Sequence, residues 1–152
     1  MFLAHYLGLL HRSERELAGA LRDVAADHRD EADVFHICRR LAERCDDHVG
    51  RLAPFVERYA EDAPDEPRRL HSALFDGTRA GGLGLLRDLH DLYLMAAECD
   101  VTWTLIGQAA QGARDEKPAG VVARCETETA IQLLWLRTRM KQAAPRALVV
   151  AT

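Results

Sequence analysis

Residues 34–59 read VFHICRRLAERCDDHVGRLAPFVERY, and this stretch carries the pattern that decides the fold. Its inward-facing positions recur at alternating intervals of four and three residues: Val34, Cys38, Leu41, Cys45, His48, Leu52, Phe55 and Tyr59. Such alternation is typical of an α-helix packed in a bundle. Because Cys45 and His48 lie in the middle of this stripe, we expect a thiol and an imidazole inside the core. The alternative for this pair is a small buried thiol beside a hydrogen-bonded core histidine.

The preceding segment has the same alternation, with Glu14 where a leucine is expected. Its stripe consists of Leu3, Leu7, Leu10, Glu14, Leu17, Leu21 and Val24. If the chain turns near residues 28–31, Glu14 lies level with about residue 45, because an antiparallel hairpin matches positions equidistant from its turn. A buried carboxylate is costly unless it is paired or binds a metal. Glu14 is therefore a candidate metal ligand, and the alternatives are pairing with His48 or pointing outward beside Glu16.

The periodicity predicts one all-α domain over residues 1–152. The expected helices span residues 2–28, 30–60, 83–113 and 118–143. Two connections are short, whereas residues 61–82 are long enough to return the chain to the other end of a bundle. A short helix is expected within this crossover at residues 66–75, EPRRLHSALF. Two hairpins joined by one long crossover give an up-down-down-up four-helix bundle.

The second hairpin also carries an acidic layer. Its last helix has Val121, Cys125, Glu128, Gln132 and Trp135 on one stripe. Glu128 is preferred over Glu126 because it shares this stripe, although both carboxylates could be solvated on the helix flank. With a turn near residue 115, Glu128 lies level with about residue 102, so Asp100 and Trp103 are its expected neighbours.

The composition excludes several classes of function. The 20 Lys+Arg are outnumbered by 24 Asp+Glu, so nucleic-acid binding is not expected. No apolar run reaches the roughly 18 residues that a membrane span needs, and the N-terminus lacks the basic region of a signal peptide. The four Cys all fall in predicted helices, which favours a reducing cytoplasm. No nucleophile or phosphate-loop motif is present, so the sequence assigns no catalytic residue, reaction or small-molecule partner.

The pattern resembles the ferritin-like superfamily of four-helix bundles over about residues 2–143. That family holds two metal ions with one Glu from each of two helices and Glu-x-x-His from each of the other two. The resemblance implies a modified site for iron or zinc, or one that holds no metal. Its candidate ligands are Glu14, Cys45, His48, Asp100 and Glu128. Cys45 stands where the family has Glu, and Ile131 stands where it has the second His. At most one ion per chain is therefore expected.

Two roles follow as expectations. The resemblance implies metal handling or defence against oxidative stress. A Cys3His zinc site that adds Cys99 and Cys125 to Cys45 and His48 is an alternative form of the site.

The second role is that of a non-catalytic structural or interaction bundle. Residues 92–95 and 133–136 are apolar on more than one helical face, which predicts a homodimer through the third or fourth helix.

Overall fold

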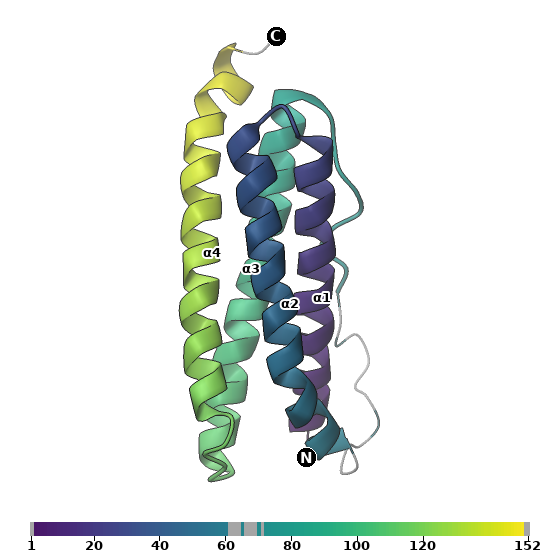
Figure 1. The fold of residues 1–152 in the computed structure, drawn as a ribbon, viewed down its shortest axis with the longest axis vertical. Helices are drawn as coiled ribbons and strands as arrows, with labels where there is room; N and C mark the ends of the chain where they lie inside the picture. The colour runs from purple at the N-terminus through teal and green to yellow at the C-terminus, as the bar shows by residue number, and fades with distance from the viewer. Residues whose placement is uncertain (1, 61–64, 66–69, 71, 151–152) are drawn as a thin grey trace.

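The computed structural model describes residues 2–60, 65, 70 and 72–150. These residues form helices and no strand (Figure 1). The elements are α1 (Leu3–Asp27), α2 (Ala32–Ala60), α3 (Gly81–Gly112), α4 (Ala119–Pro145) and the short π-helical turn η1 (Arg146–Val150). The all-α prediction is confirmed, and each long helix ends within two residues of its predicted boundary. No helix in the described part of the chain is both long and apolar enough to cross a membrane.

The crossover differs from its prediction where the structure describes it. Leu70 and residues 72–75 are not helical, although a short helix was expected at residues 66–75. Residues 66–69 and 71 lie outside the described residues. Ser72, Ala73 and Leu74 are exposed, so this part of the segment buries too little apolar surface to stabilise a helix that is marginal on its own.

Contacts between distant residues fix the relative directions of the helices. His28, just after α1, bonds Asp88 near the start of α3, whereas Glu14 in the middle of α1 bonds Trp103 further along α3. These two helices therefore run antiparallel. At the end of α4, Arg139 bonds Asp33 at the start of α2, so α2 and α4 are antiparallel as well. Figure 1 shows the four helices side by side along the long axis of the molecule.

The predicted stripes supply the core. The largest fully buried apolar side chains are Trp103, Leu10, Leu17, Leu21, Leu52, Leu89, Leu92 and Leu136, and they come from all four helices. Burying one such side chain contributes about 1.5–3 kcal/mol, so the apolar layers hold the bundle together. Between them lie charged residues, among which Glu14 and His48 are buried as predicted.

A second buried charge lies near the start of α3. The Asp88 carboxylate is fully buried and accepts hydrogen bonds from the backbone N–H of Arg79 at 2.9 Å and from its guanidinium at 2.8 Å. His28 Nε2 lies 2.8 Å from the same carboxylate. These bonds draw the Arg79 backbone against Gly84. A Cβ placed on Gly84 would lie 2.7 Å from the carbonyl carbon of Arg79.

Gly84→Ala is therefore expected to lower the free energy of unfolding by about 1–3 kcal/mol, since backbone atoms must shift to accept the methyl group. Gly82→Ala is the matched control, because a Cβ there meets no atom within 4 Å. This control should be neutral or slightly stabilising. Urea unfolding followed by circular dichroism compares the two variants. Equal midpoints would show that the close approach at Gly84 has no energetic consequence.

Candidate functional site

His48 on α2 lies between two carboxylates from other helices. Its Nδ1 is 3.0 Å from Glu14 Oε1 on α1, and its Nε2 is 3.0 Å from Glu128 Oε2 on α4. His48 is 0% exposed and Glu14 is 1% exposed. The predicted pairing of Glu14 with His48 in height is therefore found. The same contact matches the alternative interpretation of Glu14, a buried carboxylate paired with His48.

Two carboxylate contacts favour the protonated form of His48. An ionised carboxylate only accepts hydrogen bonds, and a neutral imidazole has only one N–H to donate. Both contacts are satisfied when His48 is an imidazolium that donates from both ring nitrogens. Burial acts to lower the pKa of His48, but the proximity of Cys125, together with the hydrogen bond and charge of Glu14, raises it to about 10. His48 is therefore charged at neutral pH.

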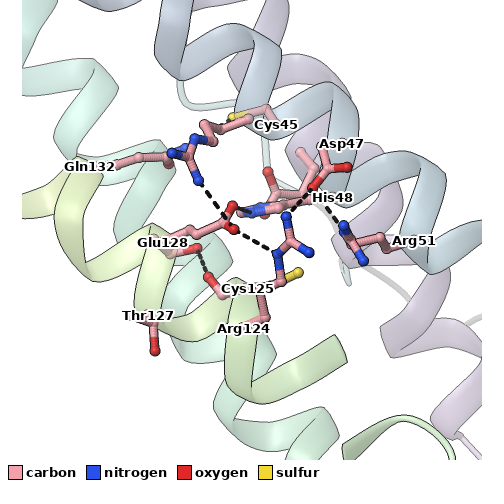
Figure 2. Close-up of polar contacts among 12 residues, drawn as sticks. Cys45, Asp47, His48, Arg51, Arg124, Cys125, Thr127, Glu128 and Gln132 are labelled. Atoms are coloured by element: carbon pink, nitrogen blue, oxygen red, sulfur yellow. Dashed lines mark hydrogen bonds and ion pairs between the residues drawn. The ribbon is translucent and has the colours of Figure 1, made fainter. Parts of the chain in front are cut away.

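Glu128 forms the outer end of this layer. Its Oε1 accepts a bond from Arg124 Nε at 2.9 Å and lies 3.2 Å from Arg44 Nη1. Figure 2 shows the Glu128 carboxylate in contact with both His48 and Arg124. Burial acts to raise the pKa of Glu128, but bonds from Arg124, His48 and Arg44 outweigh it and lower the pKa to about 2. Glu128 is therefore an ionised carboxylate that joins the buried imidazolium to two arginines near the surface.

Glu14 forms the inner end. Its Oε1 accepts bonds from His48 and from the indole N–H of Trp103 at 3.0 Å. Its Oε2 is buried without a hydrogen-bond partner among the described residues. Burial, and then the nearby charge of Glu14, raises the pKa of the Cys45 thiol well above its usual value. A neutral thiol therefore lies beside the inner carboxylate.

The four cysteines are free and buried. Burial is also the main cause that raises the pKa of Cys99, so neither it nor Cys45 is a thiolate near neutral pH. The amide of Gln132 lies 3.6 Å from Cys45 Sγ and 3.5 Å from the Leu41 carbonyl oxygen. Because thiolates are the metal-binding and nucleophilic form, the neutral Cys45 and Cys99 are suited to packing in this arrangement.

The structure groups most of the predicted site residues but leaves out Asp100. Asp100 on α3 is half-buried, and among the described residues its carboxylate makes no hydrogen bond or ion pair. The inward position is taken by Cys99, and adjacent helical residues point about 100° apart. Across the described ranges, no three His, Cys, Asp or Glu side chains converge in a way that could hold a metal ion.

Three partners of the layer were not predicted. Trp103 was expected beside Glu128 but bonds Glu14 instead. Arg124 lies four residues before Glu128 on the same helix, a spacing that could have indicated this ion pair. Arg44 reaches Glu128 from α2, and no local spacing could have indicated that contact.

Comparison with known proteins identifies no relative of this chain: no protein-family model, no curated protein and no solved structure matches it. The chemistry of the buried layer is therefore the starting point for its function.

Proposed function

We propose that this protein is an up-down-down-up, ferritin-like bundle whose metal centre is replaced by an ion-paired layer, and that it acts as a non-catalytic interaction module. The observation that carries the proposal is the engagement of both His48 ring nitrogens by carboxylates at 3.0 Å. A protonated imidazole has no lone pair to offer a metal. The antiparallel packing of α1 on α3 and the long α2–α3 connection support the ferritin-like connectivity.

Charge balance supports the same role. Glu14 and Glu128 carry two negative charges around the single positive charge of His48, and Arg44 and Arg124 compensate Glu128 from outside. An incoming cation would have to displace the His48 proton and separate at least one of the two ion pairs. The proton thus occupies the place that a metal ion takes in a ferritin-like centre, and it links α1, α2 and α4.

The outer faces of α3 and α4 support an interaction role. Leu94 and Val101 on α3 are 41% and 56% exposed, and Ile131 and Leu134 on α4 are 58% and 67% exposed. Exposed apolar residues that recur along neighbouring helices are typical of association surfaces. We propose that this face forms a homodimer, and that the four free thiols belong in a reducing cytoplasm.

One observation favours a second candidate function, the binding of a single zinc or iron ion for metal handling or oxidative-stress defence. Glu14 Oε2 lacks a hydrogen-bond partner among the described residues although the side chain is buried. Cys45 and His48 are the nearby donors, but the described side chains do not converge on this oxygen, so an ion would have to deprotonate His48 and draw the donors together. Mixed sulfur, nitrogen and oxygen donors suit zinc or iron.

Titration of tag-free protein with zinc and with ferrous iron, followed by elemental analysis, separates the two candidates. The proposal predicts substoichiometric metal and a dimer by light scattering at micromolar concentration. One ion per chain, lost in both Glu14→Gln and Cys45→Ala but retained in the surface control Arg22→Gln, would establish the second candidate. Two irons per chain would contradict both, and a monomer would contradict the proposed association surface.

A further inference from the structure

The four sides of the bundle are not equally closed. The backbones of α1 and α2 and those of α3 and α4 pack most closely, α1 also packs on α3, and α2 and α4 have the fewest close backbone approaches of the neighbouring pairs. Figure 1 shows α4 at one side of the molecule, next to α2 and α3. The two hairpins therefore approach each other least closely along the α2–α4 side.

Polar contacts bridge this side along its length. The interhelical pairs are Arg139–Asp33 at 2.6 Å, Gln132–Leu41 at 3.5 Å, Glu128–His48 at 3.0 Å, Glu128–Arg44 at 3.2 Å and Arg124–Asp47 at 4.0 Å. In the last turn of α2, Arg58 lies 3.1 Å from Asp115 in the α3–α4 connection. Arg124 and Asp47 are exposed, so separation of this pair has a small net cost. The Glu128–His48 pair is buried, so it is the polar contact on this side whose loss costs most.

On the opposite side, α1 and α3 are joined by closer backbone packing. Separation of α1 from α3 would expose core side chains such as Leu10, Leu89 and Trp103, each fully buried. It would also break the bond from Trp103 to Glu14. Because the backbones of α1 and α3 approach each other more closely than those of α2 and α4, the α1–α3 contact acts as the fixed edge and the α2–α4 side as the free edge.

Glu128 is the central contact of the free edge. It accepts from His48 and Arg44 of α2, and its side chain is only 10% exposed. Directly behind it lie His48 and Cys125, both fully buried. Figure 2 shows Glu128, Arg124 and Cys125 extending from α4 toward His48 and Cys45 on α2. Glu128 thus stands between solvent and the buried thiols.

We infer that the bundle opens along the α2–α4 side with Glu128 as the contact that holds it closed, and that this opening is the route by which small solutes reach His48, Cys45 and Cys125. The opening is a local separation of α4 from α2 about the α1–α3 contact, with the helices intact. The opening gives solutes a path to the charged layer without unfolding of the bundle. This inference does not depend on whether a metal ion binds inside.

Alkylation of the native protein with iodoacetamide, resolved by peptide mass spectrometry, tests the route. In Glu128→Gln, where the charged contact is lost at equal size, labelling of Cys125 and Cys45 should be at least about ten times faster than in the natural chain. The rates should change little with urea below the unfolding transition, because local opening exposes little new surface. Arg22→Gln, which removes an ion pair with Asp46 on the α1–α2 side, should leave both rates unchanged.

Two results would overturn the inference. Unchanged labelling in Glu128→Gln would show that Glu128 does not hold the side closed. A common rate for all four cysteines, rising with urea in proportion to the global unfolding constant, would show that the thiols become accessible only when the whole bundle unfolds. The unfolding constant of each variant, measured in parallel by circular dichroism, provides the reference rate.

Discussion

His48→Ala is expected to lower the free energy of unfolding by about 3–5 kcal/mol, because it leaves Glu14 buried without its charged partner. Glu14 is 1% exposed, so water cannot replace the lost imidazolium without disturbing the bundle. Trp103 would remain as a neutral donor to Oε1, while Oε2 already lacks a partner among the described residues. Small domains are stable by about 5–15 kcal/mol in total, so the loss is a large share of that value.

Urea unfolding at pH 7 measures this effect, and two further variants serve as controls. Arg22→Ala removes an exposed ion pair with Asp46 and should cost less than about 1 kcal/mol. Glu14→Gln combined with His48→Ala should be more stable than His48→Ala alone, because the uncompensated charge is gone. A loss below 1 kcal/mol in His48→Ala, or no recovery in the double variant, would mean that the buried ion pair contributes little.

The sequence was sufficient for the helices because their signal is local and repeated. The stripe that contains Cys45 and His48 recurs over eight positions, so an error at one position does not change the face that is buried. The height of Glu14 followed from the short connection after α1, because a tight hairpin leaves little freedom of register. The contact between Glu14 and His48 could therefore be expected before the structure was known.

The rest of the layer depends on rotation of helices about their axes, which spacing fixes only to about one residue. On α3 that uncertainty separates Asp100 from Cys99, and only packing places Cys99 inward. The reach of Arg44 to Glu128 depends on the distance between α2 and α4, a property with no local signal. Whether the core holds a proton or a metal ion depends on whether both ring nitrogens of His48 face carboxylates. The residue types alone do not decide this.

The pH dependence of stability is the second large effect. The pKa of His48 is about 10 in the folded protein, above the ordinary value of 6.5. Stabilisation by His48 is therefore complete below about pH 6.5 and is lost as the pH rises through 10. Glu128 acts in the opposite direction: its pKa is lowered from 4.5 to about 2, so its contribution is present above pH 4.5 and is lost as the pH falls toward 2.

The measurement is urea unfolding of the natural chain and of His48→Ala between pH 6 and pH 10. Over this interval the free energy of unfolding of the natural chain should fall by on the order of a few kcal/mol more than that of the variant, because one pKa unit corresponds to about 1.4 kcal/mol. Other groups that titrate there are common to both proteins and cancel in the difference. Nitrogen NMR of the His48 ring gives an independent readout, with both nitrogens protonated at pH 8.

A neutral His48 ring at pH 8 would contradict the ion-paired layer and would leave one ring nitrogen free for a metal. Glu128→Gln offers a graded test of the same point, because it removes one of the two carboxylates and should lower the pKa of His48 while Glu14 remains. The size of that decrease measures how strongly the outer carboxylate holds the proton. A large decrease would mean that opening of the α2–α4 side and release of the core proton are coupled, since both require His48 to part from Glu128.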